Sequence, residues 1–192
     1  MKNKNNQKII VFEGIDGVGK STQARLLYFA LKRKGVSVNL HHFPSAGKIG
    51  TFVRGILKSG EFDKLDEKSR AMLTVADFYD QYSRENDKVN YIIFDRYIHS
   101  NFVSNDNIER SWIESLHKFA PVPDIVFFLN CDVEIIKKRK DTDFGAKNLE
   151  RQKDFNLRYK KLFENTPKIE IDASKKREDI HDEIIKIISA KI

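Results

Sequence analysis

The sequence predicts an α/β fold of three layers, in which a five-stranded parallel sheet carries helices on both faces. Short runs of consecutive apolar residues alternate along the chain with longer amphipathic stretches. Uninterrupted apolar strands are typical of parallel sheets, because helices then cover the sheet on both sides. The length of 192 residues suits one domain, and neither an internal repeat nor a low-complexity linker divides the chain.

The first half of the chain contains three predicted strands. Ile9–Phe12 is an uninterrupted apolar run and predicts a buried strand. A helical pattern from about Lys20 to Lys34 stops at Gly35, as helices commonly do. Val36–Phe43 then alternates as a strand does. The remaining elements of this half are two helices and a strand, predicted at Ile49–Lys58, Glu67–Asn86 and Tyr91–Phe94.

The second half repeats the alternation of helices and strands. The apolar run Ile125–Leu129 predicts a fourth strand, and Lys168–Ile171 predicts a short fifth one. A polar stretch without periodicity, Asp141–Asn148, separates two of the helices. The helices of this half are predicted at Ile108–Phe119, Val133–Lys140, Leu149–Glu164 and Lys176–Ile188.

Basic residues exceed acidic ones, and the formal net charge is +7 at pH 7. This excess suits either a nucleic acid or a small polyphosphate in a positive cleft. The sequence has neither a zinc-ligand pattern nor an aromatic RNA-binding signature, so we predict no nucleic-acid partner. The alternative is that the basic runs are solvated helix ends and faces. These runs are Lys32–Lys34, Lys137–Lys140 and Lys175–Arg177.

The apolar runs are too short for a membrane span, and the polar first residues lack the apolar stretch of a secretory signal. The single cysteine, Cys131, cannot form an internal disulfide, which fits a reducing compartment. We therefore expect a cytoplasmic protein that does not bind a membrane.

The segment Gly14–Ser21 matches the phosphate-binding pattern G-x-x-x-x-G-K-[ST] at every fixed position. Glycines let the backbone amides wrap around phosphate oxygens, and the following helix points its N-terminus at the same anion. Lys20 adds a charge near the transferred phosphate, and Ser21 offers a hydroxyl to Mg²⁺. The predicted ATP-binding residues of this loop are Gly14, Asp16, Gly17, Val18, Gly19, Lys20, Ser21 and Thr22.

Asp95 ends the third predicted strand and is a candidate ligand of Mg²⁺. Ligands of open parallel sheets bind beyond the carboxyl ends of the strands, so Asp95 is expected near the phosphate loop. Arg96 follows it and can hold a phosphate through two hydrogen bonds. A surface Asp–Arg turn is the alternative.

A basic, polar segment at about residues 139–153 is a candidate for a short mobile lid. Such a segment can close on ATP, exclude water and neutralise charge in the transition state. An ordinary solvated loop is the alternative. The cations in this segment are Arg139, Lys140, Lys147, Arg151 and Lys153.

Together these residues resemble the thymidylate kinase family of nucleoside monophosphate kinases, over nearly the whole chain from Ile9 to Ile188. Phe12–Gln23 resembles the family's phosphate loop, including the acid Asp16 inside it. Asp95-Arg96-Tyr97 with Ser100 resembles its DRY segment. Two further segments are similar to those that approach the substrate phosphate and adenine: Phe43-Pro44 with Ile49-Gly50 and Arg54, and Asp172-Ala173-Ser174.

The resemblance implies a P-loop kinase fold and transfer of a phosphoryl group from ATP, with Mg²⁺, to dTMP. It implies that Asp16 contacts the 3′-hydroxyl of the monophosphate, and that Arg96 and Arg54 hold its phosphate. Ser21 and Asp95 would lie at the metal. The implied substrate site also includes Phe43, Phe78 and Tyr97, and the implied ATP site includes Ala173.

The resemblance also bears on catalysis and assembly. Gly17 stands where some family members carry a basic residue inside the loop, so catalytic arginines are expected in the lid instead. The predicted catalytic residues are Lys20, Asp95, Arg96, Arg139 and Arg151. Family members are usually homodimers, which implies the same assembly here.

The base-contacting positions depart from the family pattern. Thr74 and Phe78 align with a phenylalanine that stacks on thymine and an arginine that reads its edge. Ala46 stands where some members have an arginine, and Ser104-Asn105 where an aromatic residue and a glutamine or threonine are frequent. Phe78 is therefore either the stacking wall or a core residue. The acceptor is dTMP or, alternatively, another or several deoxynucleoside monophosphates.

A function of a different class is a P-loop switch without kinase activity. Switches of the GTPase type typically specify guanine with an Asn-Lys-x-Asp segment, which this sequence lacks.

Overall fold

The computed structural model describes residues 7–85, 88–140 and 146–191. Its strands form one parallel sheet of five strands in the order β2-β3-β1-β4-β5, as the sequence predicts. The strands are β1 (Lys8–Glu13), β2 (Val38–His42), β3 (Tyr91–Asp95), β4 (Ile125–Asn130) and β5 (Ile169–Asp172). The central position of β1 places the loop that follows it between the ends of β3 and β4.

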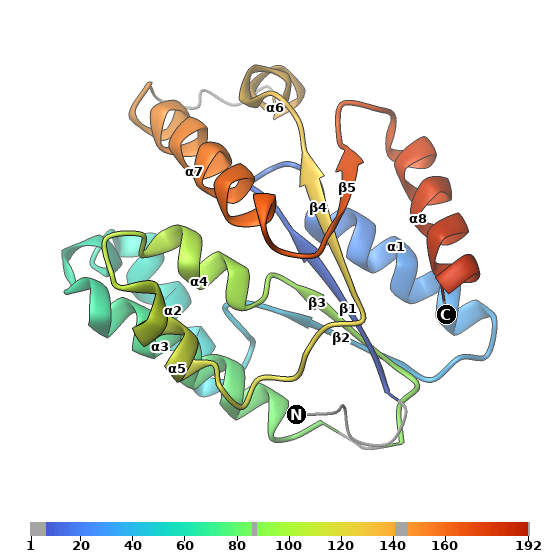
Figure 1. The fold of residues 1–192 in the computed structure, drawn as a ribbon, viewed down its shortest axis with the longest axis horizontal. Coiled ribbons are helices and arrows are strands. Elements are labelled where there is room, and N and C mark those ends of the chain that lie inside the picture. Colours follow the sequence, from blue (N-terminus) through green and yellow to red (C-terminus); the bar gives the residue numbers. More distant parts are fainter. Residues whose placement is uncertain (1–6, 86–87, 141–145, 192) are drawn as a thin grey trace.

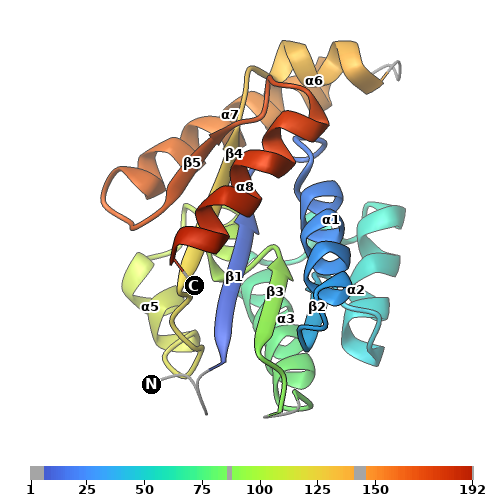
Figure 2. The same cartoon turned by 90° about the vertical axis from the view of Figure 1, so that its right-hand side faces the viewer.

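Helices cover both faces of this sheet (Figures 1 and 2). α1 (Lys20–Arg33) and α8 (Arg177–Lys191) pack against each other on one side. α3 (Glu67–Tyr82), α4 (Ile98–Ser104) and α7 (Ala146–Glu164) lie on the other side. The remaining helical segments are α2 (Lys48–Ser59), the 3-10 helix η2 (Phe62–Lys64), α5 (Arg110–Leu116) and α6 (Val133–Lys140). No helix of these described ranges is long and apolar enough to cross a membrane.

Every predicted strand and helix has a counterpart, with ends that shift by a few residues. α3 ends at Tyr82 rather than Asn86, and α7 begins at Ala146, inside the stretch expected to be irregular. The preceding part of that stretch, residues 141–145, lies outside the described residues. The three-layer α/β prediction is confirmed.

The helix α4 was not predicted from the sequence. Its residues Ile98–Ser104 include serine, asparagine and β-branched side chains, which are poor helix formers. A side chain from another element supplies its cap: Glu13 of β1 accepts hydrogen bonds from the N–H groups of Tyr97 and Ser100. The helix therefore depends on a tertiary contact that local sequence does not reveal.

Two aromatic clusters fix the helices that border the site. On α7, Tyr159 and Phe163 pack against Phe128 of β4, at centroid separations of 5.8 and 4.9 Å. On α3, Phe78 packs against Phe94 of β3 at 5.9 Å. All five rings are nearly or completely buried. Both helices are thus held rigidly against the carboxyl half of the sheet.

Candidate active site

The loop between β1 and α1 runs close to the neighbouring strand. A Cβ added to Gly14, whose φ is 138°, would lie 2.5 Å from the carbonyl oxygen of Leu129 on β4. Gly17 and Gly19 also have positive φ, of 82° and 112°. Residues that carry a side chain disfavour these conformations, so the glycines set the shape of the loop. α1 begins at Lys20, which leaves the unpaired N–H groups of its first turn at this loop.

Lys20 is a buried cation at the start of α1. It is 5% exposed, and its Nζ donates a 2.6 Å hydrogen bond to the carbonyl of Ile15. Burial, followed by the charge of Arg96, lowers the pKa of Lys20 to about 7, although nearby carboxylates act in the opposite direction. An anion placed beside Lys20 would stabilise its charged form, which suits a phosphate-binding role.

Asp95 lies beside the phosphate loop, because β3 pairs with β1 in a register that sets it opposite Phe12. Its Oδ2 lies 2.7 Å from Nδ1 of His42, and its Oδ1 is buried with no hydrogen-bond partner in the described part of the chain. Burial would raise the pKa of Asp95, but hydrogen bonds from His42 and Ser21 and the charge of Lys20 hold it below its usual value. An ionised carboxylate with an unpaired oxygen fits Mg²⁺, which takes few protein ligands and completes its shell with water and phosphate oxygens.

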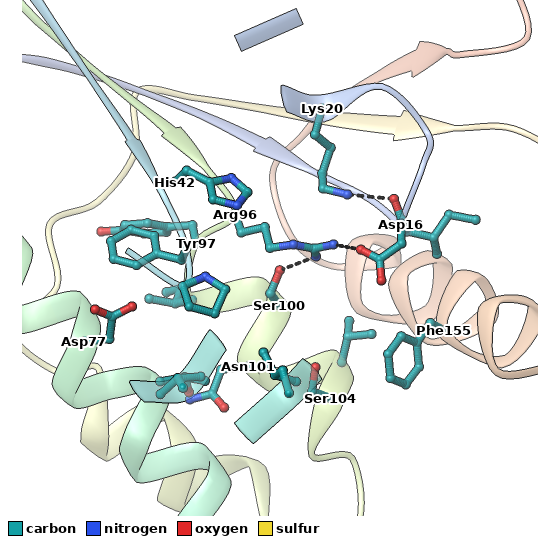
Figure 3. Close-up of a pocket in the computed structure, with 18 of the residues that line it drawn as sticks. Asp16, Lys20, His42, Asp77, Arg96, Tyr97, Ser100, Asn101, Ser104 and Phe155 are labelled. Atoms are coloured by element: carbon teal, nitrogen blue, oxygen red, sulfur yellow. Dashed lines mark hydrogen bonds and ion pairs between the residues drawn. The ribbon is translucent and has the colours of Figure 1, made fainter. Parts of the chain in front are cut away.

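Arg96 connects the end of β3 to the phosphate loop (Figure 3). Its guanidinium pairs with the carboxylate of Asp16 and donates to Oγ of Ser100 at 3.2 Å. Its φ of 74° is unusual for a residue with a side chain, and such backbone strain clusters at functional sites. Burial would lower the pKa of Arg96, but Asp16, then Tyr159 and Glu13, hold it above its usual value. Arg96 is a permanent cation at the loop.

Glu13 is a completely buried carboxylate that joins three elements. Besides capping α4, it accepts a 2.8 Å hydrogen bond from Oγ of Ser100. The hydroxyl of Tyr159 on α7 donates to the same carboxylate at 2.8 Å. Removing a partner from such a buried network leaves an uncompensated charge, so the three elements hold one relative position.

A cavity of about 630 Å³ opens beyond the loop. Asp16, Lys20 and Arg96 line one end, and Val53, Phe62 and Phe155 contribute apolar walls. Figure 3 shows Asp16 and Arg96 paired at this cavity, with Phe155 reaching it from α7. The volume suits a nucleotide-sized ligand, and the mixed lining suits a phosphate attached to a flat, largely apolar ring.

The predicted substrate residues Phe43, Phe78 and Tyr97 border this cavity but pack largely into the core. Phe78 is 4% exposed and lies within ring-contact distance of both others. The hydroxyl of Tyr97 donates to the carbonyl of Pro121 at 2.6 Å. Phe155, which sequence reasoning missed, presents a partly exposed ring to the cavity. It is the better placed aromatic wall.

The side chain of Arg54 contacts the loop after β2 and not the cavity. One guanidinium nitrogen donates to the carbonyls of Pro44 and Ser45, at 2.5 and 2.9 Å. Ser45 is held in turn by Asp77 of α3, which is 1% exposed and accepts from its N–H and hydroxyl. Arg54 does not line the cavity. Its predicted contact with a substrate phosphate would require it to leave these carbonyls.

The two arginines predicted in the lid lie apart. Arg139 lies in the last turn of α6 and donates to the carbonyls of Ala173 and Ser174, both at 2.6 Å, so it holds the loop after β5. Arg151 of α7 lines the cavity and makes two hydrogen bonds, of 3.1 and 3.3 Å, to Asp63 of η2. Their catalytic roles stay predictions, as does the contact of the buried Ala173 with adenine.

Sequence reasoning also missed Glu13 and Gln152. Glu13 directly follows the apolar run of the first strand, and an acid at the end of a buried strand indicates a buried charge. Gln152, Phe155 and Tyr159 follow the spacing of one helix face. That spacing predicts a shared face, but it does not indicate that the face borders a cavity.

A parallel sheet, a phosphate loop with a buried lysine, and a nucleotide-sized cavity beyond it are the features of a P-loop kinase that acts on a small nucleotide. Comparison with known proteins specifies the family. A sequence model described as thymidylate kinase matches residues 12–184. The chain belongs to the thymidylate kinase family.

The chain matches individual relatives over nearly their whole length. A probable thymidylate kinase of Methanocaldococcus jannaschii is 36% identical over 185 residues, covering 92% of this chain and 93% of the relative. One from Thermococcus onnurineus is 33% identical, covering 95% and 98%. The solved thymidylate kinase of Candida albicans superposes with a TM-score of 0.77 at 24% identity, covering 96% and 92%, which supports the fold.

Proposed function

We propose that this protein transfers the γ-phosphoryl group of ATP to dTMP and releases ADP and dTDP. The observation that carries the proposal is the placement of Lys20 and the Arg96–Asp16 pair on one cavity. One end of this cavity suits the phosphates of a donor, and the other suits an acceptor with its own phosphate and sugar. Family membership supports the choice of ATP and dTMP.

The geometry supports transfer by positioning and charge, which is what phosphoryl transfer mainly requires. The loop amides and Lys20 would hold the donor phosphates. Arg96 would hold the acceptor phosphate, and the carboxylate of Asp16 would accept a hydrogen bond from the sugar hydroxyl. Ser21 and Asp95 would hold Mg²⁺, which when bound neutralises charge on the donor phosphates.

The chain would act as a single kinase domain whose lid, at about residues 139–153, closes with Arg139 and Arg151 over the transferred group. It would work in the cytoplasm, where ATP is available, and as a homodimer. Exposed apolar side chains on α2 and α3, namely Phe52, Leu57 and Met72, support a subunit contact, which sedimentation would measure.

The choice of base is tested by comparing kcat/KM for dTMP, dUMP, dCMP and dGMP at one ATP concentration. We expect dTMP to be preferred. Loss of the thymine methyl is worth only about 1–3 kcal/mol, so dUMP should also be used. Because Phe78 occupies the position of the usual edge-reading arginine, a second pyrimidine should suffer a comparatively modest penalty. Preference for dGMP, or rejection of dTMP, would contradict the assignment.

A further inference from the structure

The helix α7 reaches the phosphate loop through a buried amide. Gln152 is 3% exposed, and its Oε1 accepts a 3.0 Å hydrogen bond from the backbone N–H of Asp16. Its Nε2 lies 3.5 Å from Oδ2 of the Asp16 carboxylate. The two residues are 136 positions apart in sequence. One side chain of α7 therefore contacts both the backbone and the side chain of a single loop residue.

Asp16 is restrained from two sides yet remains accessible. Its Oδ1 pairs with Arg96, while its Oδ2 faces Gln152. The side chain is still 61% exposed and lines the cavity. Because an ionised carboxylate only accepts hydrogen bonds, the group that Asp16 can bind in the cavity is a donor such as a hydroxyl.

We propose that Gln152 is a positioning residue for the acceptor nucleotide: it fixes Asp16 so that the carboxylate meets a sugar hydroxyl of the bound monophosphate. This inference rests on the proposed function and adds a residue to it. Gln152 is uncharged and contacts the loop through Asp16, so its effect on the sugar passes through that residue.

The chemistry of the contact supports this role. The amide orientation is set by the backbone, since turning it over would place an NH₂ group against the N–H of Asp16. Without the amide, the ion pair with Arg96 would pull the Asp16 carboxylate toward the guanidinium and away from Gln152. Gly17, which follows Asp16, has a φ of 82° and offers little resistance to such a movement.

The element that carries Gln152 is itself anchored. Two turns further along α7, Tyr159 donates to the buried Glu13 and packs against Phe128. A side chain on a rigid, packed helix holds a partner more accurately than one on a loop. The position of Asp16 in the acceptor site thus depends on α7 as well as on the phosphate loop.

The test compares dTMP with 3′-deoxythymidine monophosphate, which lacks the 3′-hydroxyl, as acceptors for the wild type and for Gln152→Ala. We expect the wild type to prefer dTMP. In Gln152→Ala the KM for dTMP should rise about tenfold with a smaller change in kcat, while the values for the 3′-deoxy acceptor change little. In the Asp16→Ala background, Gln152→Ala should have no further effect on the preference.

Asn156→Ala is the matched control. Asn156 is another buried amide of α7, one turn from Gln152, and it contacts the carbonyl of Cys131 rather than the loop. It should leave the preference for the 3′-hydroxyl unchanged. Equal losses on both acceptors in Gln152→Ala, or the same shift in Asn156→Ala, would overturn the inference. Failure of the wild type to phosphorylate dTMP would instead overturn the proposed function, so the two failures are distinct.

Discussion

Buried charges organise the site at the scale of single residues. Lys20, Glu13 and Asp95 are each 5% exposed or less, and Arg96 lies among them. Carboxylates compensate Arg96, whereas the pKa of Lys20 stays depressed because burial and Arg96 outweigh the acids. Bound phosphates would supply the missing negative charge. Burial therefore lowers the pKa of Lys20, whereas bound phosphates would raise it again.

Lys20→Met should abolish turnover while the protein stays folded, because the ammonium is needed where charge moves between phosphates. It should also change the pH dependence of stability. Between the folded pKa of about 7 and the ordinary value of 10.5, the unfolded chain holds a proton on Lys20 that the folded chain has lost. This residue therefore makes the free energy of unfolding rise with pH across that window.

Denaturant unfolding of the nucleotide-free wild type and of Lys20→Met, at pH 7 and pH 10, measures this difference. The increase in the free energy of unfolding from pH 7 to pH 10 should be smaller in Lys20→Met than in the wild type. Identical pH dependence in both proteins would show that the lysine is not depressed. A variant with near-normal kcat would remove Lys20 from catalysis.

How much of the site was predictable depends on how local each contact is. The phosphate loop is one continuous motif, so its residues and the positions of Lys20 and Ser21 followed from sequence. The pairing of Asp16 with Arg96 joins residues 80 positions apart, and Gln152 joins Asp16 over 136. The phosphate-binding motif indicated the loop, and the family resemblance indicated the DRY segment. Neither local pattern identifies which residue is the partner of Asp16 across the fold.

Close contacts between secondary-structure elements set the geometry of the site. The loop after β1 touches β4 at Gly14, and β1 caps α4 through Glu13. The strands were predictable because their apolar runs report burial directly. The helix α4 was not, because its stabilisation comes from a side chain that is close in space and distant in sequence.

Gly14→Ala tests the approach of the loop to β4. The new Cβ would lie 2.5 Å from a backbone oxygen, so the loop must shift, and we expect a loss of about 3 kcal/mol in unfolding free energy together with weakened ATP binding. Gly35→Ala is the matched control. Its φ of 75° is also unfavourable, but nothing lies within 4 Å of the added Cβ, so the cost should be about 1 kcal/mol.

Urea titrations of both variants, with ATP binding measured by calorimetry, provide the comparison. Equal destabilisation in the two would mean that backbone conformation, and not the contact with Leu129, limits position 14. Unchanged ATP affinity in Gly14→Ala would mean that the loop tolerates the shift.

The whole molecule brings donor and acceptor to one edge of the sheet. Because the five strands are parallel, the loop after β1 and the carboxylate that ends β3 meet at that edge. Residues of α3, α4 and α7 line the cavity, and these three helices lie on one face of the sheet (Figure 1). The alternation of strands and helices made this architecture predictable. The walls of the base pocket were not, since they combine single residues from helices separated along the chain.

Phosphoryl transfer from ATP to dTMP can be followed directly with a labelled phosphoryl group. The protein is incubated with Mg²⁺, dTMP and ATP labelled in its γ-phosphoryl group, and the products are separated. We expect the label to appear in dTDP, with one ADP formed for each dTDP, and we expect little ATP to be consumed without dTMP. Label found only in inorganic phosphate, or no label transfer by folded protein that binds both nucleotides, would contradict it.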